Sequence, residues 1–184
     1  MFYMISGENY RTLILLLICI LFSQCKSVQD DTIKFGNDFF EYAVSKDGKN
    51  LHFIDLLSGI DYLRKEPEES CAYILKGGKK YDASSVSMSG SNMIIEFEGT
   101  DVTIRIRIKK FSDRFTWTVN SINGDPESLT FLNIPLTLEG MPYESFAACA
   151  LSMNLFTHVR QLQALQTHLW ASCYSRFGFK NAEI

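Results

Sequence analysis

The strongest constraint on the fold of this chain is a strict alternation of apolar and polar residues between Val102 and Lys109. Aliphatic side chains fill every second position, and the positions between them carry Thr103, Arg105, Arg107 and Lys109. Alternate side chains of a β-strand point to opposite faces, so this segment predicts a half-buried strand with one apolar and one cationic face. A helix would scatter the same aliphatic residues around its circumference.

Shorter β-prone segments, separated by turn residues, lie on both sides of this strand. Residues 39–44 and 51–56 flank an Asp-Gly turn, which is a strong hairpin signal. Further apolar segments lie at residues 72–75, 84–88, 93–97, 115–119 and 129–138. Pro135 lies in the last of them and predicts an edge strand or a bulge. The pattern predicts an all-β fold, an antiparallel β-sandwich of seven or more strands.

Two registers are open for the hairpin that turns near Gly99. A two-residue turn sets Glu98 opposite Asp101, and two like charges facing each other are unfavourable. A four-residue loop keeps the same faces and sets Glu96 opposite Arg105. We favour this second register.

The next hairpin has one favoured register. A loop over residues 111–114 sets Ile108 opposite Trp117 and Ile106 opposite Val119, which keeps the apolar side chains on one face. Trp117 is therefore expected in the core, and the alternative is a platform on which a ligand stacks. The two arginines of the preceding strand are expected on a solvated face.

The C-terminal segment from Gly140 onward has no clear period. Residues 158–166 are compatible with a short helix, and a long loop fits nearly as well. Residues 172–179 are expected to form a final strand. We expect a β-sandwich domain over residues 33–184 with an irregular or short helical C-terminal segment. Because the chain stops directly after an apolar stretch, a further hypothesis is that it is truncated.

The N-terminus has the parts of a secretory signal peptide. Arg11 precedes an apolar run from Leu13 to Phe22. That run is shorter than the roughly 17–25 apolar residues of a membrane-spanning helix. We assign residues 1–24 to the leader and 25–32 to a polar tether.

The residues around the cleavage region suggest an anchor. Leu21-Phe22-Ser23-Gln24-Cys25 resembles a bacterial lipobox of the looser kind found in Bacteroidota, although Phe22 and Gln24 depart from the strict pattern. The resemblance implies lipidation of Cys25 and an exported lipoprotein, periplasmic or on the cell surface, with outer-membrane lipid as its partner. Plain secretion and a retained anchor helix are the alternatives.

The net charge and the cysteine content bear on nucleic-acid binding, disulfide bonds and metal sites. The formal net charge is −3 and no basic block is present, so nucleic-acid binding has no electrostatic support. Beyond the leader and Cys25, the chain keeps Cys71, Cys149 and Cys173, which allow at most one internal disulfide. The simpler interpretation is three buried thiols that act as small hydrophobic side chains. No metal or cofactor is expected, because no C-x-x-C or histidine motif is present.

Several segments of the body look like parts of a known protein class. They are residues 39–50 with Phe53-Ile54-Asp55, residues 114–120 and residues 176–179. With the leader, they resemble the galactose-mutarotase-like N-terminal β-sandwich of large Bacteroidota glycan-degrading lipoproteins. In that class the sandwich precedes a barrel domain that generally holds the catalytic acids. The resemblance therefore implies a glycoside hydrolase-associated module without catalytic residues, and a missing catalytic domain as a partner.

Aromatic, imidazole and guanidinium groups gather in the C-terminal region. The candidate carbohydrate-binding residues are Trp170, Tyr174, His158, His168 and Arg160. Such groups, placed on loops at one end of a sandwich, hold a sugar by stacking and hydrogen bonds. The alternative is that the two aromatic rings pack against the sandwich or a missing domain. The remaining histidine, His52, is expected to be structural. The aspartates lie mostly at turns and strand ends, where turn chemistry accounts for them, so no catalytic pair is assigned.

Three interpretations of function follow from these features. The first is a non-catalytic module that supports a catalytic domain or helps to form a glycan cleft in an exported carbohydrate-processing lipoprotein. The second is a free-standing carbohydrate-binding surface lipoprotein. The third, and weakest, is a small glycoside hydrolase that acts alone.

Overall fold

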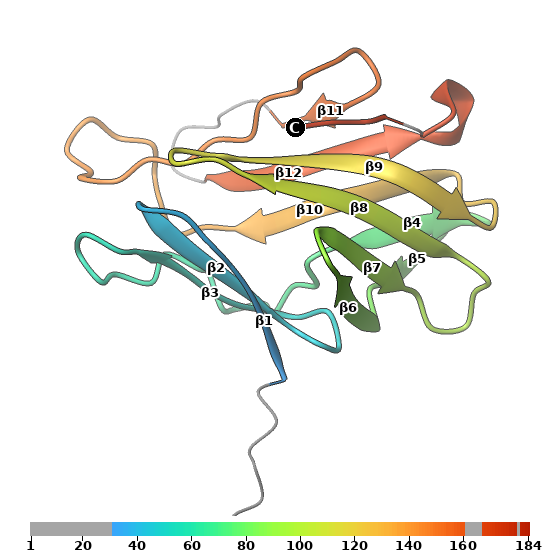
Figure 1. The fold of residues 1–184 in the computed structure, drawn as a ribbon, viewed down its shortest axis with the longest axis horizontal. Coiled ribbons are helices and arrows are strands. Elements are labelled where there is room, and N and C mark those ends of the chain that lie inside the picture. Colours follow the sequence, from blue (N-terminus) through green and yellow to red (C-terminus); the bar gives the residue numbers. More distant parts are fainter. Residues whose placement is uncertain (1–30, 161–166, 180) are drawn as a thin grey trace, which may run out of the picture. The chain divides into compact units, whose positions relative to one another are not determined.

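The computed structural model describes residues 31–160, 167–179 and 181–184. Within these ranges, twelve strands form three antiparallel sheets (Figure 1). The predicted all-β sandwich is therefore confirmed. Helix in the described residues amounts to the 3₁₀ turn η1 (Ser175–Phe177), so the helical C-terminal segment is minimal. The expected leader, Cys25 and most of the expected tether lie outside the described residues.

A three-stranded sheet begins the domain. Its order is β1-β2-β3, with bounds β1 (Thr32–Gly36), β2 (Phe40–Ser45) and β3 (Asn50–Asp55). The predicted Asp-Gly hairpin joins β2 to β3. Gly48 has φ +84, and a Cβ built there would lie 2.8 Å from the backbone oxygen of Ala83, so this turn requires glycine. Strand β1 was not predicted, and it begins at the last residue assigned to the tether.

A four-stranded sheet carries the alternating strand that dominates the sequence. Its order is β6-β7-β8-β9, with bounds β6 (Ser85–Ser89), β7 (Asn92–Glu96), β8 (Thr103–Lys110) and β9 (Phe115–Asn123). Ile108 pairs with Trp117 and Ile106 with Val119, which confirms the predicted β8–β9 register. A bulge between Arg105 and Ile106 shifts the rest of the pairing by one residue.

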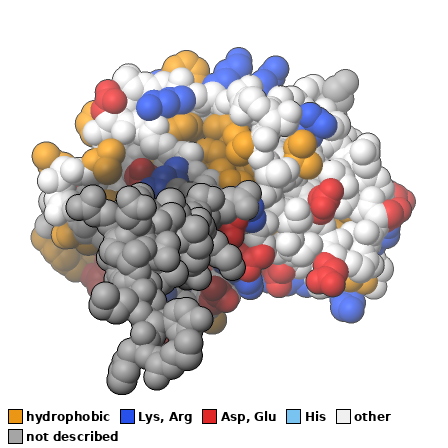
Figure 2. Space-filling model, turned by 60° about the horizontal axis from the view of Figure 1, so that its bottom comes forward, with side chains coloured by type: hydrophobic (Ala, Val, Ile, Leu, Met, Phe, Trp, Pro, Cys, Tyr) orange, Lys and Arg blue, Asp and Glu red, His pale blue; other side chains and the backbone are white. Residues whose placement is uncertain are grey.

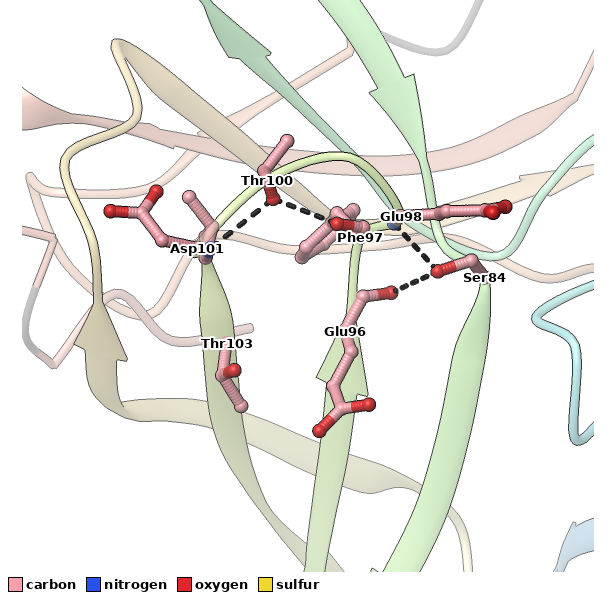
Figure 3. A pocket seen from close by; sticks show the side chains of 8 residues that line it. Ser84, Glu96, Phe97, Glu98, Thr100, Asp101 and Thr103 are labelled. Carbon is pink, nitrogen blue, oxygen red and sulfur yellow. Dashed lines mark hydrogen bonds between the residues drawn. The ribbon is translucent and has the colours of Figure 1, made fainter.

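The favoured β7–β8 register is wrong. Glu96 lies opposite Thr103, as the two-residue turn would place it, and not opposite Arg105. The expected repulsion between Glu98 and Asp101 does not arise, because the two carboxylates point in opposite directions from the turn (Figure 3). The Asp101 carboxylate forms an ion pair with Lys76 of another hairpin, and this contact lowers the pKa of Asp101.

The β7–β8 turn is also held by hydroxyl groups, as Figure 3 shows. The Thr100 hydroxyl donates to the Phe97 carbonyl at 2.8 Å and accepts the Val102 N–H at 3.2 Å. The Ser84 hydroxyl accepts the Glu98 N–H at 2.7 Å. These local bonds account for the hydroxyl groups of Ser84 and Thr100, which line the hollow beside the turn.

The third sheet has five strands. Its order is β11-β12-β10-β4-β5, with bounds β11 (His158–Val159), β12 (His168–Tyr174), β10 (Ser128–Pro135), β4 (Tyr73–Lys76) and β5 (Lys79–Asp82). The predicted bulge is not at Pro135, since it falls between Thr130 and Leu132. Strand β10 is central in the sheet, but β4 pairs with it only over Ser128–Thr130, so at Pro135, its last residue, β10 pairs with β12 alone among the named strands. Proline is tolerated where one side of a strand is unpaired, because no ladder hydrogen bond needs its missing N–H there.

Two other expectations for this sheet need correction. Residues 158–159 form a strand and not a helix, while the rest of the expected helix, 161–166, lies outside the described residues. The final strand covers His168–Tyr174 and not residues 172–179, because Ser175–Phe177 turns and Gly178 has φ +80. Strand β5 was missed because its Lys79-Lys80-Tyr81-Asp82 sequence forms a mostly exposed edge without apolar alternation.

One hydrophobic cluster joins all three sheets, so their inward faces share a single core. Ile95, Ile106, Leu129 and Ala171 are among its fully buried members. Trp117 is 6% exposed, which confirms its predicted place in the core. The two arginines of β8 are exposed on the opposite face, as expected.

The cysteines only partly match the simple interpretation. Cys71 and Cys173 are buried, whereas Cys149 is exposed, and all three are free thiols. Burial raises the pKa of each buried thiol to about 12. Cys173 occupies a core-facing position of β12 and Cys71 lies in the core just before β4, whereas Cys149 lies on an exposed part of the loop after β10.

Candidate functional site

The candidate residues come together on one face of the five-stranded sheet. Leu169, Ala171 and Cys173 of β12 are buried in the core, so the residues between them point to the other side of the sheet. His158 of β11 pairs with Ser172 of β12, which places the His158 side chain on that same side. We call this surface the β12 face; its candidate residues are His158, Arg160, His168, Trp170 and Tyr174.

Trp170 is the centre of the aromatic contacts. Its indole N–H donates to the Tyr73 hydroxyl of β4 at 3.1 Å. The His158 ring meets the Trp170 ring edge-on, with centroids 5.4 Å apart and planes at 90°. His158 Nδ1 lies 3.2 Å from the Tyr174 hydroxyl. Edge-on packing and hydrogen bonds fix the rings in place, which suits a surface on which another ring stacks.

Cationic groups lie over these rings. The Arg160 guanidinium is 5.4 Å from the Trp170 centroid, and the Arg176 guanidinium is 5.4 Å from the Tyr174 centroid. Both are cation–π distances. Lys80 lies 4.6 Å from the centroid of the Tyr73 ring and forms an ion pair with Asp82 at 2.7 Å. Lys80 is therefore neutralised by a carboxylate, whereas the two guanidinium groups contact aromatic rings.

A hydrogen bond joins His168 to Arg160, and its direction defines which imidazole nitrogen of His168 carries the proton. Arg160 Nη1 lies 3.0 Å from His168 Nδ1, and a guanidinium has no acceptor, so Nδ1 accepts. Nε2 then carries the proton and donates to Asn133 Oδ1 at 2.9 Å. The Asn133 amide in turn donates to the Ser70 carbonyl at 2.7 Å and to the Glu69 carboxylate at 3.2 Å. The chain of bonds links the exposed arginine to a buried amide.

The electrostatics keep this imidazole neutral. Burial is the largest cause that lowers the pKa of His168 to about 4; the positive charge of Arg160 acts in the same direction, and Glu69 opposes the shift in part. Both ring nitrogens are already hydrogen-bonded, so His168 offers no lone pair for proton abstraction. Its chemical role on this face is to position Arg160.

The other titratable candidates are structural. His52 on β3 lies 3.0 Å from Glu41 on the neighbouring strand. The Asp55 carboxylate accepts the N–H groups of Leu57 and Ser58, and hydrogen bonding with the Ser58 hydroxyl is the main cause of its lowered pKa. These contacts are the turn chemistry expected for such aspartates.

The sequence analysis missed the partners that complete the β12 face. They come from other strands: Tyr73 and Lys80 from β4 and β5, Asn133 from β10, and Arg176 from η1. Tyr73 carries a usable signal, because it alternates with the core residue Ile74. Asn133 carries no such signal. It lies inside an apolar run without alternation, and its pairing with Trp170 of β12 depends on the order of the strands in the sheet.

Comparisons with known proteins add no relative. No family model, curated protein or solved structure matches the chain. Among the described residues, no helix is long and apolar enough to cross a membrane. In the same part of the chain, no group of three or more His, Cys, Asp or Glu side chains is arranged to hold a metal ion.

Proposed function

We propose that this chain is a non-catalytic β-sandwich module of an exported, lipid-anchored carbohydrate-processing protein, and that its β12 face binds glycan. One observation carries the proposal: five candidate residues lie on one sheet face, where Trp170 and Tyr174 offer rings and Arg160 offers donors. The leader and the lipobox-like segment support export and anchoring through Cys25.

The charges of the β12 face favour an acidic glycan. Arg160 and Arg176 present guanidinium groups beside two aromatic rings. A guanidinium matches the planar geometry of a carboxylate and binds it with two parallel hydrogen bonds. A sugar ring packs on the aromatic side chains while a uronic acid carboxylate meets the arginines. We therefore expect polygalacturonate to bind more tightly than neutral galactan.

Calorimetry with the leaderless chain 25–184 carrying Cys25→Ser tests this function. Trp170→Ala should weaken polygalacturonate binding about tenfold or more, which is about 1.4 kcal/mol. Arg160→Gln should remove the preference for the acidic polymer. Phe111→Ala is the matched control, because Phe111 is a 39% exposed aromatic residue on the β8–β9 turn. A well-folded protein that binds neither polymer would contradict the proposal.

The anchoring and the supporting role need separate measurements. Mass spectrometry of the mature protein should find an acylated Cys25 as the first residue, and an unmodified terminus beyond it would rule out the lipoprotein. A barrel-sized frame encoded directly downstream of Ile184 would favour a supporting module. Glycan affinity without such a frame would favour a free-standing binding protein.

A further inference from the structure

An apolar cavity of about 510 Å³ lies between the sheets, apart from the β12 face. All three sheets contribute to its wall, which includes Phe35, Phe40, Tyr42, Phe53, Phe115 and Trp117. Leu169 of β12 also lines it, whereas Trp170, the next residue, belongs to the β12 face. The volume falls within the range of about 300–1,000 Å³ of small-molecule sites. Protein interiors rarely leave such space unfilled.

The loop between β10 and β11 forms one side of the cavity. Residues 145–151 and Met153 line it, and the loop is tied down at both ends. The Glu144 carboxylate accepts the N–H groups of Glu139 and Met141 at 2.8 and 2.9 Å. The Met153 N–H donates to the Glu183 carbonyl at 2.9 Å. The ring of Phe146, in the middle of the loop, stacks on Tyr62 with centroids 5.4 Å apart, so the loop also packs on the body of the domain.

Apolar side chains reach the surface at its mouth. Phe39, Leu151 and Met153 line the cavity and are 55%, 66% and 62% exposed. Figure 2 shows a face on which hydrophobic side chains gather near the middle of the view, with Lys and Arg side chains above them. Apolar side chains that gather on the surface beside a cavity are a feature of ligand-binding grooves.

The charged groups of the cavity wall lie at one end, at the β8–β9 turn. Arg114 and Asp113 line it there and pair at 2.9 Å, with about 60% of each side chain exposed, so the pair is weak. Lys110 pairs with Phe115 in the sheet and therefore shares its face. Lys110 is exposed and is not part of the cavity wall, but it lies beside this end and adds a second cation to the Asp113–Arg114 pair, which makes the end attractive to an anion.

We infer that the cavity binds a single-chain anionic amphiphile, a long-chain carboxylate, with its tail among the aromatic side chains and its head at Arg114. The apolar wall excludes a sugar, because sugar hydroxyls would lose their hydrogen bonds to water without replacement. The cationic end selects a carboxylate over a neutral head. This site is separate from the glycan site, so either proposal can fail alone.

The two tryptophans of the chain separate the two sites in one assay. In Trp170→Phe, Trp117 in the cavity wall is the only indole, so its emission should change saturably with sodium laurate below micelle formation. In Trp117→Phe, the emission of Trp170 should not respond. Affinity should rise about fourfold for each added CH₂ from octanoate to myristate, until the cavity is full. Absence of a saturable change in folded Trp170→Phe would overturn the inference.

Two pairs of variants test the position of tail and head. Ala148→Phe fills the cavity from its loop and should weaken laurate binding about tenfold or more. Leu155→Phe is the control, since Leu155 is 97% exposed on the same loop. Arg114→Gln should weaken laurate about tenfold but leave dodecanol unchanged, whereas Arg107→Gln on the solvated face should change neither. The inference would be overturned if Ala148→Phe bound laurate as tightly as the native chain, or if Arg114→Gln lost as much affinity for dodecanol as for laurate.

Discussion

The neutral state of His168 makes the stability of this protein depend on pH in a defined window. The pKa of His168 is about 4 in the folded protein against 6.5 for the free side chain, and burial is the largest cause. The unfolded chain therefore binds more protons than the folded one between these two values. By linkage, His168 stabilises the fold fully above about pH 6.5, and this contribution is lost as the pH falls towards about 4.

The magnitude follows from the displacement of the pKa. A change from 6.5 to about 4 corresponds to at most about 3.4 kcal/mol, at about 1.4 kcal/mol for each tenfold change in proton affinity. The His168 side chain is only half-buried, and solvent screens its interaction with Arg160. We expect about 1.5–2 kcal/mol of the free energy of unfolding to be lost through this group.

Urea unfolding of the native chain and His168→Gln at about pH 7 and about pH 4.5 measures this contribution. Glutamine keeps an acceptor for Arg160 and a donor for Asn133 but does not titrate. The native chain should lose about 1–2 kcal/mol more than the variant between the two pH values, because all other groups titrate in both proteins. Equal losses in the two proteins, or an NMR titration of His168 near 6.5, would refute the reasoning.

The remaining predictions concern the core, a turn and a thiol. Ile106→Ala should lower the free energy of unfolding by about 2–5 kcal/mol, while Arg107→Ala on the solvated face should change it by about 0.5 kcal/mol or less, as urea unfolding will show. Gly48→Ala should destabilise by about 1–3 kcal/mol more than Gly77→Ala, since both have positive φ but only Gly48 approaches Ala83; equal melting temperatures would contradict this. In the native leaderless chain carrying Cys25→Ser, a maleimide should modify Cys149 alone, and mass spectrometry finding a second label before unfolding would refute the burial of the other two thiols.

Much of the candidate site was predictable, because its five proposed residues lie within a short stretch of the chain. The three on β12 alternate with core residues, so the period of a strand brings them to one face. What the sequence did not indicate is that β11 pairs beside them and that Asn133 and Tyr73 reach them from β10 and β4. Those contacts depend on strand order, which alternation does not encode.

The apolar cavity lay beyond sequence reasoning altogether. Trp117 was predicted to be buried, and it is, but the same burial places its ring in a cavity wall. Period-two alternation says that a side chain faces inward. It does not say whether the facing layer fills the space, because that depends on how far the sheets and the covering loop stand apart.

By itself, the sequence determined the strands that alternate clearly, such as β8 and β9, the face that each presents to the core, and the β8–β9 register, because these follow from local alternation and turn chemistry. Only the tertiary structure decided what depends on distant neighbours. In the β7–β8 register that local charge disfavoured, the Asp101 carboxylate forms an ion pair with Lys76, which belongs to another hairpin. Pro135 ends a central strand, since strand order is set by packing of whole sheets and not by one residue. The physical reason is that backbone pairing and burial are non-local, whereas side-chain alternation is a property of each strand alone.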